Sequence, residues 1–323
     1  MFRRTFLGFL PATLALAAPT SILAQSAYPS GPVKIIVPVS AGGTVDITTR
    51  ALAVKLADAL GQSVVVENKT GGAGVPATLA AIRATADGQT LYMGTIGTIG
   101  VNPLLMKRPP YDPERDLVPV SLVAEVPGVL VTHPSVPANS VKELIAYAKA
   151  NPGKLNFGTP GNGTSPHMAA TLFMQRAGVE LVHVPYQGTA PAMGDLLSGR
   201  VQLYFDNIIT SRPHIQEKKL KALAVSGAKR SPLLPGVPTV SESGLPGFEV
   251  TGWLGLMAPA GTPQAVVQRL ASEIQKITSL PDMKDKVVGA VWIGSTPEEF
   301  KALIKSEHER WAAVIEAGKL QQN

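Results

Sequence analysis

Residues 33–54 read VKIIVPVSAGGTVDITTRALAV, and this stretch decides the fold. The apolar run 33–39 is typical of a buried strand, and it breaks at the small residues 40–44. A helix pattern follows at once, with Gly61 where a C-terminal cap would stand. Because the first helical turn leaves backbone N–H groups unpaired and the helix dipole favours negative charge, this unit predicts the floor of an anion site.

One such loop is not specific, since many strand–loop–helix units carry glycine for turn geometry alone. The pattern recurs, however. Each of four predicted strand exits combines glycine with small hydroxyl side chains: Gly42, Gly43 and Thr44; Gly94 and Thr95 with Thr98; Gly158 and Thr159 with Gly163, Thr164 and Ser165; Gly188 and Thr189. In a parallel sheet such loops share the C-terminal edge, where open α/β folds bind ligands. Main-chain amides and small alcohols there can hold a carboxylate without a counter-charge.

Strands alternate with helices along the chain, which predicts an α/β fold with mainly parallel sheets. A chain of 323 residues is long enough for two lobes. We expect residues 28–127 and 248–323 to form lobe 1, and residues 128–247 to form lobe 2, joined by two hinge crossings.

Residues 117–132 mark the first crossing. They are apolar and β-branched but interrupted by Pro127 and Gly128, so we interpret them as a pair of strands. Capping-box patterns at 140–143 and 295–298 predict helix starts. The second one opens a C-terminal helix whose apolar stripe is Phe300, Leu303, Ile304 and Trp311.

The first 24 residues are predicted to be a signal peptide, with Arg3 and Arg4 before an apolar segment and cleavage near Ala24 or Ala27. The two arginines fit either a twin-arginine signal or an ordinary basic start. The chain has no cysteine, which excludes disulfides, a lipid-anchored cysteine and Cys-zinc sites. A net charge of +6 without basic clusters predicts no nucleic-acid partner. We expect a periplasmic monomer.

Several polar side chains near the loops have more than one interpretation. Ser165, His167 and Asp206 could form a hydrolytic triad, but no nucleophile elbow surrounds Ser165, and His167 could instead orient its own loop or donate to a ligand. Asp46 and Asp206 could bind a ligand or fix their loops. Tyr186 could turn its hydroxyl into a cleft or pack on the surface. Since His133 and His183 lack metal-ligand spacing and no nucleotide-binding fingerprint is present, we predict no metal and no cofactor.

With these residues in view, the mature chain resembles the Bug family, the periplasmic solute receptors of tripartite tricarboxylate transporters. The likeness rests on IVP at 36–38, GGTVD at 42–46, VENK at 66–69, GGAG at 71–74, DG at 87–88, NP at 102–103, YDP at 111–113, DL at 116–117, GTPGNGTSPH at 158–167, VPY at 184–186 with Gly188, and FD at 205–206. One departure is Ala41, which stands where the family usually has proline.

The resemblance implies a two-lobed, type II-like Venus-flytrap fold that closes on a small organic acid. It also implies delivery to a membrane permease with no chemical change, hence no enzyme activity. Alternatives are a ligand sensor docking onto a sensor kinase, and a periplasmic hydrolase. The expected ligand-binding residues are Ser40, Ala41, Gly42, Gly43, Thr44, Asp46, Thr95, Thr98, Gly158, Thr159, Gly163, Thr164, Ser165, His167, Tyr186, Gly188 and Asp206.

Overall fold

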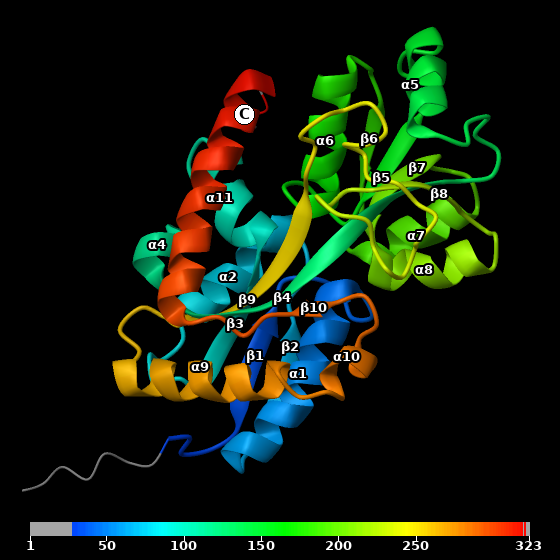
Figure 1. Ribbon diagram of the computed structural model, residues 1–323. Helices are drawn as coiled ribbons and strands as arrows, with labels where there is room; N and C mark the ends of the chain where they lie inside the picture. Colours follow the sequence, from blue (N-terminus) through cyan, green and yellow to red (C-terminus); the bar gives the residue numbers. More distant parts are fainter. Residues whose placement is uncertain (1–27, 319, 321–323) are drawn as a thin grey trace, which may run out of the picture.

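The computed structural model describes residues 28–318 and Leu320, so the expected signal peptide and its cleavage site lie outside the described residues. Two α/β lobes are joined by long strands that run diagonally from one lobe to the other (Figure 1). Among the described residues, no helix is both long and apolar enough to cross a bilayer.

Lobe 1 begins with the unit predicted from residues 33–54. Strand β1 (Val33–Val37) pairs in parallel with β2 and β3, and α1 ends at Gly61, which adopts φ 65° as a left-handed cap. The elements up to the first crossing are α1 (Thr44–Leu60), β2 (Val64–Asn68), the 3-10 turn η1 (Gly72–Gly74), α2 (Val75–Ile82), β3 (Thr90–Thr95), the π-helical turn η2 (Ile96–Val101), α3 (Asn102–Leu105) and α4 (Pro113–Asp116).

The first crossing is a single strand, β4 (Leu117–Thr132), so the expected pair of strands was wrong. Up to Pro127, β4 pairs antiparallel with β9 (Thr251–Pro259). From Gly128 onward it pairs antiparallel with β7 (Leu203–Asn207) and β8 (Lys221–Val225). The Pro127–Gly128 step therefore marks a change of partner within one continuous strand.

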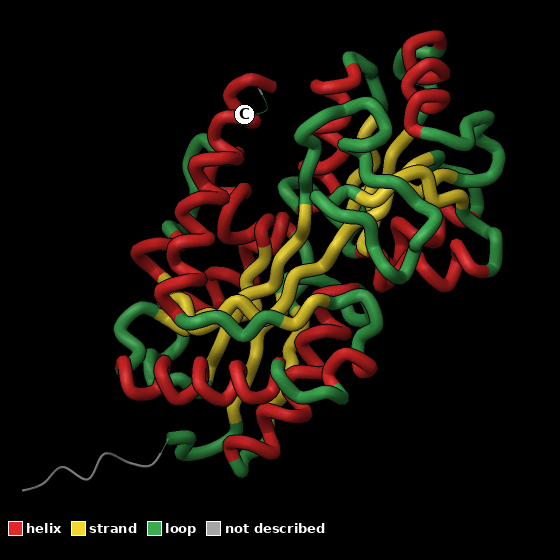
Figure 2. The backbone as a smooth tube through the Cα atoms, viewed as in Figure 1, coloured by secondary structure: helices red, strands yellow, loops and turns green. Residues whose placement is uncertain are grey.

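Lobe 2 contains α5 (Val141–Ala150), β5 (Asn156–Thr159), α6 (Ser165–Ala177), β6 (Val182–Pro185), α7 (Thr189–Leu197), β7 (Leu203–Asn207), α8 (Ile208–Gln216) and β8 (Lys221–Val225). Strand β5 pairs in parallel with β6 and β7. The strand order is β2-β1-β3-β9-β4-β7-β5-β6, with β8 and the short β10 (Val291–Trp292) both pairing with β4. The expected parallel pairing thus holds for the outer strands of each lobe, whereas the crossing strands are antiparallel to their neighbours. Figure 2 shows the strands in the middle of each lobe with helices around them.

After β9 the chain covers lobe 1 with α9 (Gln264–Thr278), α10 (Met283–Lys286), β10 (Val291–Trp292) and α11 (Pro297–Gly318). The cap of α11 lies one residue later than predicted. Glu299 N donates to Thr296 Oγ1 (3.2 Å), and Thr296 N donates to Glu299 Oε2 (2.9 Å). Ser295 is not the cap because its hydroxyl accepts a bond from Leu122 N of β4 (2.9 Å).

Helix α11 runs beside the crossing strands and reaches lobe 2. Phe300, Ile304 and Trp311 of its predicted stripe are buried. The Phe300 ring meets Trp253 of β9 edge-on, with ring centroids 5.5 Å apart. Further along, Arg310 donates to the carbonyl of Glu249, and Gln175 Nε2 of α6 donates to Val314 O (3.3 Å). The last helix therefore bonds to segments on both sides of the hinge.

The contact between Phe300 and Gly255 of β9 generates a prediction on stability. A Cβ at Gly255 would overlap the fully buried Phe300 ring, so Gly255→Ala should lower the free energy of unfolding by about 1–3 kcal/mol. Gly194→Ala in α7 is the control, because nothing lies within 4 Å of its added methyl. Urea unfolding measures both variants, and an unchanged midpoint for Gly255→Ala would contradict the packing.

Candidate functional site

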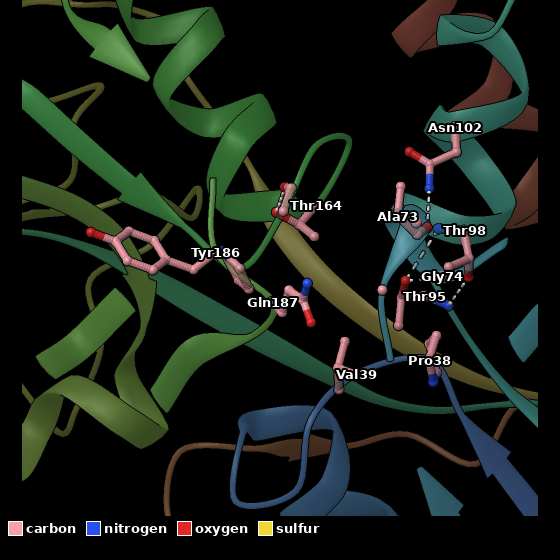
Figure 3. A pocket seen from close by; sticks show the side chains of 15 residues that line it. Pro38, Val39, Ala73, Gly74, Thr95, Thr98, Asn102, Thr164, Tyr186 and Gln187 are labelled. Atoms are coloured by element: carbon pink, nitrogen blue, oxygen red, sulfur yellow. Dashed lines mark hydrogen bonds between the residues drawn. The ribbon is translucent and has the colours of Figure 1, made fainter. Parts of the chain in front are cut away.

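Loops from the two lobes enclose a first cavity, of about 80 Å³, called here the outer cavity. Lobe 1 supplies the ends of β1 and β3 with η1 and η2, and lobe 2 supplies the loops after β5 and β6 (Figure 3). Its lining consists of Pro38, Val39, Gly71, Gly72, Ala73, Gly74, Thr95, Gly97, Thr98, Asn102, Pro160, Gly161, Thr164, Tyr186 and Gln187.

A second cavity, of about 50 Å³, lies closer to the crossing strands and is called here the inner cavity. It is lined by Val39, Thr44, Val45, Thr95, Ile96, Val126, Pro160, Thr164, Ser165, Pro166, Thr189, Asn207, Trp253 and Leu254. Val39, Thr95, Pro160 and Thr164 line both cavities, so the two are neighbouring chambers of one cleft between the lobes.

The lobes touch around these chambers. A Cβ built on Gly97 of η2 would lie 3.1 Å from the carbonyl oxygen of Gly163 and 3.3 Å from Thr164 Cα. A Cβ on Gly188 would overlap the hydroxyl of Ser40. Main chain from one lobe thus packs directly on the other at two places, which is the arrangement of a closed cleft.

Within the part of the chain that the structure describes, no charged side chain lines either chamber. The polar groups present are hydroxyls, carboxamides and main-chain amides. These include the first turn of α1, whose N-cap Gly43 provides no side-chain cap. Such a wall can hold an anion by dipoles and hydrogen bonds without a formal counter-charge.

Of the first predicted loop, only Thr44 lines a chamber. Ser40 packs against Gly188, Ala41 and Gly42 are exposed, and Gly43 is buried against Thr189. Their predicted role as ligand-binding residues therefore rests on main-chain groups, and Ser40 in addition sits at a lobe contact.

The Asp46 carboxylate bonds to its own loop, to the next turn of α1 and to the end of β2. It accepts bonds from Gly42 N (2.9 Å), Arg50 Nε (3.0 Å) and Asn68 Nδ2 (2.9 Å). Burial raises the pKa of this carboxyl, but the hydrogen bonds from Arg50, Gly42 and Asn68 outweigh burial and leave the pKa below its ordinary value. Of its two interpretations, the structure favours the one in which Asp46 shapes the loop.

In lobe 2 the loop 158–167 forms one wall of both chambers. Thr164 and Ser165 line the cleft together with Pro160. Gly158, Thr159 and Gly163 are not among the lining residues, and Gly163 lies at the contact with η2 and Asn102 of lobe 1. The Thr159 hydroxyl accepts a bond from Gly161 N (3.2 Å), and Thr164 Oγ1 donates to Gly161 O (2.7 Å), so the loop is held by its own hydroxyls.

Two stacked histidines support this loop from behind. The rings of His167 and His183 have centroids 4.4 Å apart, and His183 stacks in turn on Phe157. His167 Nδ1 accepts a bond from Gly163 N (3.1 Å), and His183 Nε2 shares a bond of 2.6 Å with Thr159 Oγ1. Burial lowers the pKa of His167 to about 3, with a contribution from His183, and burial lowers the pKa of His183 to about 4. Both rings are therefore neutral near pH 7.

Tyr186 and Asp206 direct their polar atoms elsewhere. Tyr186 is among the residues that line the outer cavity, but its side chain points away from the other lining residues (Figure 3), and its hydroxyl donates to Asp195 Oδ2 (2.7 Å). Asp206 is fully buried and accepts bonds from Thr210 Oγ1 (2.6 Å) and Ser211 Oγ (2.7 Å). Burial raises its pKa to about 6.

The groups proposed for a hydrolytic triad are bonded elsewhere. His167 Nδ1 is taken by Gly163 N, and Asp206 Oδ2 by two hydroxyls of α8. In the described part of the chain, no hydrogen bond joins Ser165, His167 and Asp206 to one another. The geometry thus gives no support to hydrolysis at this site.

Several lining residues were missed from the sequence. The 71–74 glycine segment contributed to the family resemblance but was not among the residues predicted to bind ligand. Asn102, whose Nδ2 donates to Ala73 O (2.6 Å), holds that segment against η2. Trp253 and Asn207 sit within or directly after apolar strands, where no local pattern separates a cleft residue from a core residue.

Comparisons with known proteins agree with this architecture. Residues 48–320 match the family described as the tripartite tricarboxylate transporter family receptor. Protein BugT of Bordetella pertussis is 38% identical over 312 residues, covering 96% of this chain and 95% of BugT.

Solved structures are similar over nearly the whole fold. The Rhodopseudomonas palustris protein Rpa4515 with adipate superposes with a TM-score of 0.87 at 35% identity, covering 90% of this chain and 98% of that one. MatC of the same species with bound malate gives a TM-score of 0.85 at 32% identity, covering 89% and 100%. The chain therefore belongs to the tripartite tricarboxylate transporter receptor family, the periplasmic solute receptors that include the Bug proteins.

Proposed function

We propose that this protein is exported to the periplasm, binds a small organic carboxylate between its lobes, and delivers it unchanged to the membrane permease of a tripartite tricarboxylate transporter. The observation that supports this most strongly is the uncharged, two-chambered cleft at the N-terminus of α1. Related receptors have been solved with adipate and with malate, both carboxylates.

The proposed site uses groups from both lobes. One carboxylate lies against the loop 40–44 and the wall formed by Thr164 and Ser165, where main-chain amides and hydroxyls are the donors. The rest of the ligand extends towards Thr95 and Thr98 in the outer cavity. Because water is displaced when the lobes close, each hydrogen bond strengthens, and the ligand's higher affinity for the closed form drives closure.

Ligand binding is the first test of this proposal. Purified protein is screened by thermal shift against mono-, di- and tricarboxylates, aromatic acids and amino acids, because a ligand that binds only the folded state raises the melting temperature. We expect stabilisation by at least one carboxylate and recovery of that acid chemically unaltered. Absence of stabilisation across the panel, or recovery of a converted product, would refute the proposal.

Delivery to a permease is tested separately in cells. Deleting the gene should abolish uptake of the identified acid. If uptake persists and only the induction of transport genes is lost, the protein is a sensor and the permease partnership is wrong.

The loop at Gly43 generates a prediction on affinity. A methyl at this position would contact Thr189 Oγ1 at an ordinary 3.5 Å, whereas the branches of valine would press into the opposite lobe. We therefore expect Gly43→Val to weaken binding at least ~10-fold, which corresponds to about 1.4 kcal/mol, and Gly43→Ala to weaken it much less. Calorimetry with the identified acid measures both, and equal affinity of Gly43→Val and wild type would contradict the site.

The contact of Gly97 with Gly163 and Thr164 predicts how closure can be blocked. Gly97→Ala places a methyl against main chain of lobe 2, which cannot move aside like a side chain, so this variant should remain open and bind ligand at least ~10-fold more weakly. Gly100→Ala in the same turn is the matched control, because its methyl meets nothing nearer than 3.8 Å.

Small-angle X-ray scattering measures this closure as a decrease in the radius of gyration. Ligand should reduce the radius of gyration of wild type and of Gly100→Ala, but not that of Gly97→Ala. If Gly97→Ala contracts and binds as wild type does, the lobes do not meet at this point.

The neutral histidine stack predicts a dependence of stability on pH. Unfolded histidine titrates near pH 6.5, whereas folded His167 and His183 have pKa values of about 3 and 4. The unfolded chain therefore takes up more protons as the pH falls below 6.5, and the stability present above that pH is lost towards pH 4.

His183→Phe keeps a stacked ring but removes one of the two titrating groups. Its free energy of unfolding should fall less between pH 7 and pH 5 than that of wild type, as measured by urea unfolding at each pH. His133→Gln, a substitution outside the stack, is the control. An identical loss in His183→Phe and wild type would show that His183 does not resist protonation.

A further inference from the structure

Two residues that line the inner cavity each carry a buried polar atom with no hydrogen-bond partner among the described residues: Thr44 Oγ1 and Trp253 Nε1. Both residues are nearly inaccessible, with 2% and 3% of their surface exposed. A buried polar atom without a partner is costly, and native proteins rarely leave one except where a ligand or water completes it.

The chemistry of these atoms defines what can complete them. An indole N–H can only donate, and a threonine hydroxyl can donate as well. Thr44 is the first residue of α1, whose free main-chain N–H groups are also donors. Among the described residues, the lining of the inner cavity thus includes several donors and no charged side chain. The group that satisfies the indole N–H is an acceptor such as a carboxylate oxygen.

The other two tryptophans provide an internal comparison. Trp311 Nε1 donates to Glu307 Oε2 (2.8 Å), which is the usual state of a buried indole. Trp292 Nε1 also lacks a partner, but Trp292 lies on β10 and does not line the cleft. Trp253 alone of the three combines an unpaired N–H with a place on the cavity wall.

The position of Trp253 gives such a bond a particular consequence. Trp253 lies in β9, a crossing strand, opposite Glu125 of β4. Its ring is held edge-on by Phe300 of α11, so the N–H cannot swing freely. A ligand bonded to Trp253 would contact the hinge as well as the two lobes.

We propose that Trp253 is a ligand-binding residue and that its indole N–H donates to a carboxylate oxygen of the solute in the inner cavity. This inference rests on the proposed function. It adds a side chain from the crossing strand to a site otherwise built from loop main chain and hydroxyls.

Titration of the ¹⁵N-labelled protein with adipate and with malate, followed by NMR of the indole N–H groups, tests this inference. The resonances are assigned with Trp253→Phe and Trp292→Phe, and calorimetry on the same samples reports binding. We expect the Trp253 proton to shift downfield at saturation while those of Trp292 and Trp311 stay in place. Trp253→Phe, which keeps an aromatic ring against Phe300, should bind at least ~10-fold more weakly, because bonds to charged groups contribute about 1.5–3 kcal/mol. Trp292→Phe should bind as wild type does.

The outcomes separate this inference from the proposed function. If an acid binds by calorimetry while the Trp253 resonance stays in place and Trp253→Phe keeps full affinity, the assignment of Trp253 is overturned and the receptor function stands. If neither acid binds wild type, the inference is overturned for these ligands, and the wider carboxylate screen decides the receptor function. If Trp253→Phe does not fold, the Trp253 resonance of wild type is identified as the one that remains once the Trp292 and Trp311 resonances are assigned. Its shift on titration then decides the inference.

Discussion

The antiparallel pairing of β4 with β9 is the constraint on which the rest of the structure depends. β9 leads the chain back into lobe 1, and β4 belongs to both lobes, because it passes from one set of partners to the other at Pro127 and Gly128 without ending. Because the outer parallel strands of each lobe are aligned on this pair, their C-terminal loops meet across a common space. The inner cavity lies where those loops approach the crossing strands, and Val126 and Trp253 come from the strands themselves.

A cleft without charged lining side chains recognises its ligand differently from one with an arginine clamp. Each hydroxyl or amide contributes modestly, and no single ion pair dominates the binding free energy. Discrimination between acids of the same charge then depends on shape and on where each acceptor oxygen falls. The residues that hold the cleft-lining loops in place therefore matter as much as the residues that line the cleft. Asp46 orders one loop, and the His167–His183 stack orders the other.

Sequence reasoning was reliable where chemistry is local. The strand, loop and helix around Gly43 follow from periodicity and capping, and Thr44, Thr95, Thr98, Thr164 and Ser165 were placed at the cleft because strand exits share one edge of a sheet. It was weaker where a role depends on tertiary neighbours. The direction of the Tyr186 hydroxyl is decided by Asp195, and the cap of α11 by a bond between Ser295 and β4. Trp253 was missed because the sequence around a residue in an apolar strand does not show whether its side chain faces a cavity or the core.

The reach of α11 across the hinge has a consequence for how such a receptor evolves. Val314 O accepts a bond from Gln175 of lobe 2, and Arg310 donates to the carbonyl of Glu249 where the chain returns to lobe 1, both remote from the chambers. Separating the halves must strain or break these bonds, so their strength enters the balance between the empty open and empty closed forms. Substitutions along this outer helix can therefore retune the resting balance, and with it the apparent affinity, while the recognition chemistry stays the same.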